Sequence, residues 1–446
     1  MADSIKITIE IPRAVVRDVI VGAVGIGAIY AGYRIFRGSI DAAVTKAFGG
    51  ERSDQKVEDI KPGSLHVCLR CFTDERFLEV LEEYKSGKIK ERLEKELSDI
   101  GIETEGLVVV GIENIKEVEK KAAALKISAM TTPQIIVQGG AYWQKPRDTS
   151  LEISDDEYKN ILKESAKTGY AILMRDGGTA VDAVEAAVRV LEDSEHFDAG
   201  YGSLLNNDGE VECDAMIMDG NTLDNGAVIT GRNFRNPVSL AKKIMNETVH
   251  CALSGEGALQ FAQREEFPIS EQEELISPGV KKLQIRYPDF VKYERNRFKG
   301  IPTPASDTVS AVARDANGYL ACATSTGGVA GRMKGRVSDA SLVGCGGYAN
   351  EHGAATTSGL GESIMKMTLA REVVYQMEGG RNAQESAVMA LDRMRERLGD
   401  VAGVTAIDNQ GNFGRAFTTE MMVWASIKDD KIQFGLKPNE VEEEKL

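Results

Sequence analysis

The chain has 446 residues, a formal net charge of −15 and 28% charged residues. Its length allows two or three domains, and its apolar content is that of an ordinary globular protein. The negative charge argues against a protein that binds nucleic acid. The charge is unevenly spread, because residues 1–130 carry 20 Lys and Arg against 22 Asp and Glu. Almost all of the net negative charge therefore lies in the second part of the chain.

The first 37 residues contain a predicted strand and a candidate membrane helix. Residues 4–11 alternate between polar and apolar side chains, and residues 19–33 carry no charge. With its apolar flanks, this second segment approaches the ~20 residues that span a bilayer. Small residues recur at every fourth position (Ala23, Gly27, Ala31), which suits helix packing in lipid. A membrane-spanning helix and a buried or interfacial helix both stay open, whereas the pattern of a cleaved signal peptide is absent.

Residues 38–63 are polar and are predicted to connect this segment to a small α+β domain at residues 64–126. The domain is expected to contain two strands and two amphipathic helices, in the order 65–72, 75–98, 106–111 and 115–125. Cys68 and Cys71 fall on opposite faces of the first strand, which argues against a redox or metal pair.

Two stretches of this domain carry a resemblance: Leu65-His-Val-Cys-Leu-Arg-Cys-Phe72 and the eighteen residues from Arg76 to Leu93. They resemble the N-terminal domain of the TNF-receptor-associated death-domain adaptor. The resemblance implies an interaction module with a protein partner of unknown identity. The alternative is an unrelated α+β domain.

Residues 127–133 are a plausible linker, and residues 134–446 are expected to form a second domain. It begins with a short buried strand at 134–141 that runs into two glycines. The next predicted elements are helices at 155–175, 180–191 and within 238–261. Thr179 is the expected N-cap of the second helix. Residues 264–305 are polar and form the least structured stretch of this domain.

A hairpin follows, and it carries the first candidate nucleophile. Thr308 stands at the start of a predicted strand, Asn317-Gly318 signals a turn, and the second strand ends at Thr326. Ser310 and Val312 should point to the same face as Thr308, because side chains alternate along a strand. Threonine is also common in strands for structural reasons, so this pattern alone does not establish catalysis.

The remaining sequence supplies charged and glycine-rich loops. Arg336 and Asp339 place a cation and an anion three residues apart, which suits a zwitterionic amino acid or a surface ion pair. A glycine turn at 359–362 leads into a helix predicted at 363–377 and can present N–H groups to an oxyanion. Strands are expected at 403–408, 413–417 and within 424–434, followed by an acidic tail at 440–446.

Histidines and cysteines limit the possible chemistry. The four histidines show no metal spacing, and no Ser-His-Asp or Cys-His arrangement is evident. The six cysteines suggest no disulfide framework, which suits a reducing compartment such as the cytoplasm or the cytoplasmic face of a membrane. A hydrolase with this sequence needs a base other than histidine.

Six motifs in order identify the second domain as a member of the type-2 asparaginase and isoaspartyl-peptidase family of N-terminal-nucleophile hydrolases. They are Asp176-Gly-Gly-Thr-Ala-Val-Asp-Ala-Val-Glu185, Phe197-Asp-Ala-Gly-Tyr-Gly-Ser203, Asp307-Thr-Val-Ser-Ala-Val-Ala313, Thr324-Ser-Thr-Gly-Gly328, Gly335-Arg-Val-Ser-Asp339 and Gly359-Leu-Gly-Glu362. The resemblance runs from about residue 134 to about residue 438. It implies a four-layer αββα sandwich, no cofactor for catalysis, and a homodimer of processed subunits.

The resemblance also implies a role for each motif residue. The chain cuts itself between Asp307 and Thr308, and the α-amine of Thr308 then serves as its own base. Asparagine and β-aspartyl peptides are the implied substrates. The resemblance further implies that Thr326 supports the nucleophile and that Gly361 lies near the substrate. Arg336 would bind the substrate carboxylate and Asp339 the substrate ammonium. Ser358 and Gly359 would form the oxyanion hole. A structural sodium loop would use Leu191, Glu192, Phe197, Ala199 and Tyr201, mainly through their carbonyls.

Several residues depart from the family pattern. Ser358 replaces threonine, Asp198 replaces asparagine, Ser310 replaces glycine, Gln138 replaces the first histidine of a His-Gly-Gly sequence, and Leu360 replaces a polar residue. None removes the nucleophile. Two functions therefore stay open: a self-processing hydrolase, and a membrane- or partner-tethered scaffold whose asparaginase-like domain is slow or inactive.

Overall fold

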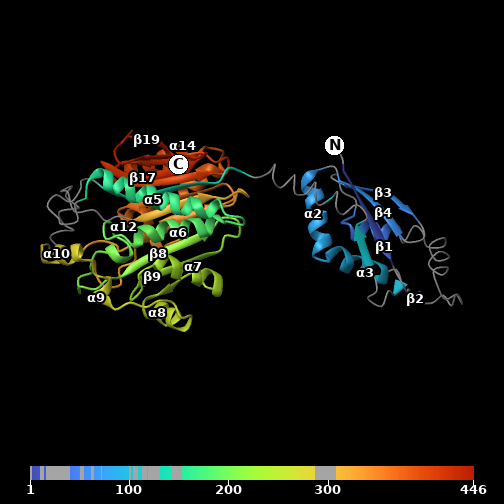
Figure 1. Cartoon of the computed structure of the whole chain (residues 1–446), viewed down its shortest axis with the longest axis horizontal. Helices are drawn as coiled ribbons and strands as arrows, with labels where there is room; N and C mark the ends of the chain where they lie inside the picture. Colours follow the sequence, from blue (N-terminus) through green and yellow to red (C-terminus); the bar gives the residue numbers. More distant parts are fainter. Residues whose placement is uncertain are drawn as a thin grey trace. The chain divides into compact units, whose positions relative to one another are not determined.

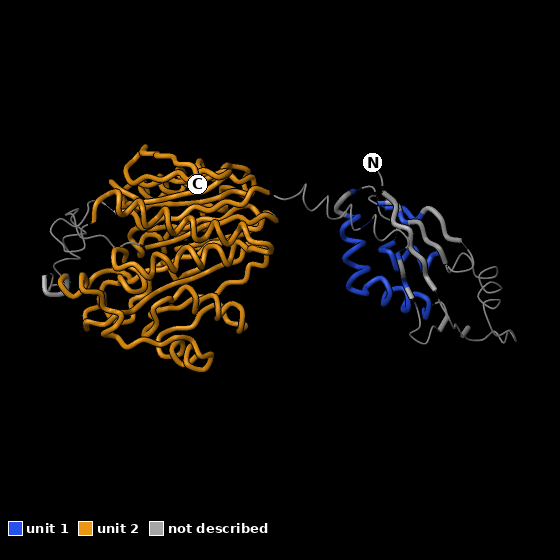
Figure 2. The backbone as a smooth tube through the Cα atoms, viewed as in Figure 1, with its two compact units in different colours: residues 1–130 blue, residues 131–446 orange. Residues whose placement is uncertain are grey.

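The computed structural model describes residues 3–10, 15–16, 41–50, 55–61, 65–71, 73–99, 102–103, 109–112, 118, 131–142, 153–286 and 308–446. The chain divides into two compact units, residues 1–130 and residues 131–446 (Figure 2). The candidate membrane helix, the helix predicted at 115–125 and Asp307 lie outside the described residues, apart from Val118. No helix in the described ranges is long and apolar enough to cross a membrane.

The first unit is built on a four-stranded antiparallel sheet in the order β3-β4-β1-β6. Its strands are β1 (Asp3–Glu10), β3 (Gln55–Lys61), β4 (Leu65–Cys71) and β6 (Val109–Ile112). A separate short pair joins β2 (Val15–Val16) to β5 (Ile102–Glu103). The alternating strand expected near the N-terminus is confirmed as β1. The predicted domain at 64–126 leaves out β1 and β3, although both are hydrogen-bonded to β4.

Residues 74–99 form two helices where one was expected. The prediction of a single helix over 75–98 is wrong, because α2 (Asp74–Lys85) and α3 (Lys88–Asp99) are separate. Gly87 lies between them with φ of 79°, a left-handed conformation that favours glycine and ends a helix. The apolar residues assigned to the helix are nevertheless buried at Phe77, Leu81 and Leu93.

The second unit contains two sheets that face each other. The larger sheet has the order β10-β9-β8-β12-β11-β7-β17-β18-β19, and the smaller sheet has the order β13-β14-β15-β16. The larger sheet comprises β7 (Gln134–Tyr142), β8 (Cys213–Asp219), β9 (Asn225–Gly231), β10 (Leu253–Ser254), β11 (Val309–Arg314), β12 (Leu320–Thr326), β17 (Met421–Lys428), β18 (Lys431–Gly435) and β19 (Glu442–Lys445). The smaller sheet comprises β13 (Gly347–Asn350), β14 (Gly353–Gly359), β15 (Ala402–Asp408) and β16 (Phe413–Phe417).

Helices cover the outer faces of both sheets, and Figure 1 shows those that lie over the larger sheet. The larger sheet is covered by α5 (Asp155–Leu173), α6 (Ala180–Glu192), α7 (Pro237–Glu247) and α8 (Gly255–Arg264). The smaller sheet is covered by α13 (Leu369–Glu378) and α14 (Ala383–Leu398). The layers therefore run helix, sheet, sheet, helix, a mixed α/β fold.

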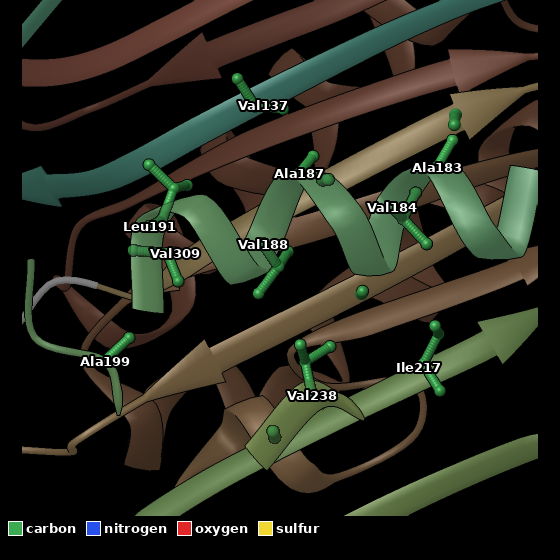
Figure 3. Close-up of a cluster of buried hydrophobic side chains, with 14 of the residues drawn as sticks. Val137, Ala183, Val184, Ala187, Val188, Leu191, Ala199, Ile217, Val238 and Val309 are labelled. Carbon is green, nitrogen blue, oxygen red and sulfur yellow. The ribbon is translucent and has the colours of Figure 1, made fainter. Parts of the chain in front are cut away.

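Helix α6 shows why the small-residue pattern matters. Thr179 caps it as predicted, accepting a bond from Asp182 N at 3.1 Å. Its apolar face packs on the strands of the larger sheet, where Ala183, Ala187 and Leu191 belong to the same buried cluster as Val137 and Val309 (Figure 3). Alanines let the helix approach the sheet closely, and this packing fixes the strand that follows Thr308, the candidate nucleophile.

The structure corrects two predicted segments and adds a strand to a third. The stretch at 264–305 contains α9 (Gln272–Leu275) and α10 (Pro278–Arg286) within its described part. The helix expected at 363–377 is split into α12 (Gly361–Met367) and α13, because Thr368 adopts a left-handed φ of 45°. The acidic tail is partly ordered as β19, which pairs with β18.

Candidate active site

Thr308 lies immediately before β11, at the end of a hairpin confirmed by the β11–β12 register. Val309 pairs with Ser325, so Thr308 comes next to Thr326 at the end of β12. Both threonines are buried, with 4% and 1% exposure. The Thr326 Oγ1 accepts a hydrogen bond from Gly328 N at 3.0 Å, which ties the hydroxyl to the turn that follows.

Ser358 reaches the same place from β14 in the facing sheet. Its Oγ accepts a hydrogen bond from Ala141 N at 3.1 Å and one from Thr308 N at 3.4 Å. A serine oxygen has two lone pairs and one proton. Because both lone pairs are used, the proton is left to donate in a third direction. The two N–H groups also fix the side chain, which compensates for the methyl group that a threonine would have there.

A second contact between the sheets lies two residues further along each strand. Ser310 Oγ is 2.7 Å from Thr356 Oγ1, which in turn is 2.9 Å from Thr405 Oγ1. All three hydroxyls are fully buried. Val309, Ala311 and Ala313 instead belong to the core under α5 and α6, as strand alternation predicted. Thr356 and Thr405 were not predicted as site residues, although the alternation of Thr356 with Ser358 along one strand was an available signal.

Arg336, Asp339 and Gly361 are brought together by the fold. A Cβ atom placed on Gly361 would lie 2.7 Å from Asp339 Oδ1 and 2.8 Å from Arg336 Nη2. Arg336 forms its ion pair with Glu362, donating from Nε and Nη2 at 3.0 Å each, rather than with Asp339. Burial raises the pKa of Asp339 to about 6, against the opposing effect of Arg336. Sequence reasoning gave Glu362 no role.

Asp198 is a buried residue beside the turn that follows Thr326. Its Oδ1 accepts a bond from Leu204 N at 2.7 Å, and its carbonyl accepts one from Gly327 N at 2.7 Å. Its Oδ2 has no hydrogen-bond partner among the described residues. Burial raises the pKa of Asp198 to about 7, although Arg332 and Arg336 favour the charged form. This group therefore places an ionisable charge beside the turn after Thr326.

A buried ion pair that was not predicted packs against the turn after Thr326. Arg332 donates to Asp214 Oδ2 at 2.7 Å and also to the carbonyl of Glu212. The side chains of Arg332 and Asp214 are 1% and 0% exposed. Gly328 has φ of 88°, and a side chain there would collide with Arg332. The pair thus fixes the chain between Thr326 and Arg336.

The loop implied to hold sodium is lined by backbone carbonyls. Gly200 packs so closely that a Cβ atom would lie 2.5 Å from the Glu192 carbonyl oxygen, and Gly202 packs against the Phe197 carbonyl. The carbonyls of Phe197 and Ala199 each accept one backbone hydrogen bond, which leaves each a second lone pair. Oxygen donors of this kind fit a hard cation. The described residues contain no cluster of His, Cys, Asp and Glu that could hold a metal ion.

Comparison with known proteins gives the second unit its relatives. Residues 131–436 match the family model described as Asparaginase. The chain is 44% identical over 306 residues to the isoaspartyl peptidase/L-asparaginase of Danio rerio, covering 68% of this chain and 95% of that protein. It is 41% identical over 310 residues to the Xenopus laevis protein of the same name, covering 68% and 95%. It is 40% identical over 309 residues to the Homo sapiens protein, covering 69% and 97%.

Proposed function

The chain belongs to the asparaginase family, and on this premise we propose that it is a self-processing threonine hydrolase of L-asparagine and β-aspartyl peptides. The observation that carries the proposal is the contact of Ser358 Oγ with Thr308 N across the two sheets. This contact places a hydroxyl donor beside a buried threonine whose backbone nitrogen belongs to the peptide bond that would be cleaved. No cofactor is required for this chemistry.

The first step is cleavage of the peptide bond between Asp307 and Thr308. The Thr308 Oγ attacks the Asp307 carbonyl carbon, the C–N bond breaks, and the nitrogen takes up the proton that the hydroxyl loses. The break of the C–N bond frees the α-amine of Thr308. Water then hydrolyses the resulting ester, which releases the Asp307 carboxylate and restores the Thr308 hydroxyl. That amine has an ordinary pKa of about 7.7–8.0 and can serve as a base near neutral pH.

Turnover reuses the same atoms on a substrate amide. The Thr308 amine takes the hydroxyl proton while Oγ attacks the side-chain carbonyl, and it returns this proton to the substrate nitrogen, which leaves as ammonia or as an amine. Water then hydrolyses the acyl ester, which releases the acid product and restores the Thr308 hydroxyl. Ser358 Oγ–H and Gly359 N–H are proposed to stabilise the oxyanion. Arg336 is proposed to bind the α-carboxylate and Asp339 the α-ammonium, with Gly361 leaving room for the substrate. The support is that these side chains converge on Gly361.

Other parts of the proposal rest on the resemblance or, for the membrane segment, on amino-acid composition. We assign a structural Na⁺ to the carbonyls of the loop from Leu191 to Tyr201, with Glu192, Phe197 and Ala199. Processed subunits are proposed to pair as homodimers. Residues 64–126 are proposed to bind a protein partner, and the uncharged segment at residues 19–33 to attach the protein to the cytoplasmic face of a membrane.

A denaturing gel tests processing directly. Purified protein is expected to yield two fragments that divide the chain after Asp307, whereas a Thr308→Ala variant stays intact. Release of ammonia from asparagine then tests turnover. A single full-length band after long incubation, the same as that of the Thr308→Ala control, would reject self-processing. That outcome would favour the scaffold, for which the buried Asp198 carboxyl group is the specific supporting observation.

A further inference from the structure

Arg336 is held along one edge by a carboxylate of its own chain. Its Nε donates to Glu362 Oε1 and its Nη2 to Glu362 Oε2, both at 3.0 Å. Two parallel bonds of this type fix the plane of a guanidinium group as well as its position. The Arg336 side chain is 15% exposed and that of Glu362 is 48% exposed, so the pair lies where the buried site meets solvent.

The bonds to Glu362 leave the opposite edge of the guanidinium for another acceptor. Arginine has five N–H donors, and Glu362 accepts two of them. The donors left over are two on Nη1 and one on Nη2. Nη2 lies beside Gly361, where the missing side chain leaves space that Asp339 also borders. A second carboxylate placed there would meet Arg336 through Nη1 and Nη2.

Asp339 is the competitor for that edge. Its Oδ2 is buried and has no hydrogen-bond partner among the described residues, and Arg336 is the first of the groups that favour its charged form. A guanidinium free to turn would pair with Asp339, because a buried charge without a partner is costly. Such a pair would occupy both groups proposed to bind the substrate.

We propose that Glu362 is a positioning residue that holds Arg336 away from Asp339 and thereby sets the selectivity for substrates with a free α-carboxylate. The inference rests on the proposed function and deepens it. Glu362 binds the edge of the guanidinium formed by Nε and Nη2, and the substrate carboxylate binds the edge formed by Nη1 and Nη2. Asp339 then stays available for the substrate ammonium. Glu362 itself takes no part in bond making or breaking.

The test compares Glu362→Gln with wild type on two substrates. Glutamine keeps the shape of the side chain but removes the charge that holds the guanidinium. For asparagine, KM is expected to rise at least tenfold while kcat stays within about threefold. For the α-carboxamide of asparagine, which has no carboxylate for Arg336, kcat/KM is expected to change less than twofold.

Glu378→Gln is the matched control, because Glu378 pairs with Arg371 at 3.1 Å on another surface of the same unit. It should leave both substrates unaffected. An unchanged KM for asparagine in Glu362→Gln, or an equal loss on both substrates, would overturn the inference. Wild-type protein that releases no ammonia from asparagine would instead reject the proposed function, so the two failures are distinguishable.

Discussion

Ser358 offers the sharpest test of whether the family's chemistry survives in this chain. The family pattern implied by the resemblance has threonine at this position, and the loss of its methyl group frees rotation about the Cα–Cβ bond. Three staggered rotamers are available to a free serine side chain, so fixing one costs at most about 0.65 kcal/mol, or threefold in rate. The bonds from Ala141 N and Thr308 N contribute about 0.5–1.5 kcal/mol each and outweigh that cost.

Two substitutions follow from this comparison. Ser358→Thr is expected to change kcat by less than threefold, because the serine rotamer is already fixed. Ser358→Ala is expected to lower kcat by about 10²–10³, the usual loss for one oxyanion donor. The same change leaves the N–H of Ala141 without its acceptor, which costs about 1–3 kcal/mol of folding free energy.

The assays are the rate of fragment formation on gels and the rate of ammonia release from the processed protein. Thermal unfolding of each variant separates effects on packing from effects on chemistry, since residue 358 is fully buried. A rise in kcat above tenfold in Ser358→Thr would refute the reasoning, because it would mean that the serine hydroxyl is poorly held. Full activity in Ser358→Ala would refute the oxyanion role itself.

Three further predictions concern stability. Ser310→Ala should lower the free energy of unfolding by about 1–3 kcal/mol, because the buried Thr356 hydroxyl loses a partner; equal denaturant midpoints would contradict this. Asp198 has a folded-state pKa near 7 that lies above its unfolded value, so its ionisation destabilises the fold as pH rises from about 4 to 7. Asp198→Asn should therefore gain melting temperature over wild type at pH 8 and much less at pH 5, and a gain independent of pH would count against it. Deleting residues 437–446 removes β19 together with Glu440 and Glu442, the ion-pair partners of the buried Lys159, so the melting temperature should fall. The deletion also leaves β18 as an unpaired sheet edge, which should promote association that light scattering can detect.

Local patterns were sufficient for the elements that depend on nearby residues. The β11–β12 hairpin was predictable because strand alternation and an Asn-Gly turn act within about twenty residues. The cap at Thr179 and the small-residue face of α6 were predictable for the same reason. Breaks in longer helices were missed where one residue adopts a left-handed conformation, as at Gly87 and Thr368, because periodicity does not report backbone dihedrals.

The sequence by itself determined the family, the candidate nucleophile and most of the residue types in the site, since these follow from motif order and from the lack of a histidine base. Only the tertiary structure decided which of these side chains are in contact. Ser358 meets Ala141 from 217 positions away, and Arg332 meets Asp214 from 118. It also showed that Arg336 pairs with Glu362 and not with Asp339. Contacts of this kind depend on how two sheets pack, and the spacing of residues along the chain carries no information about that packing.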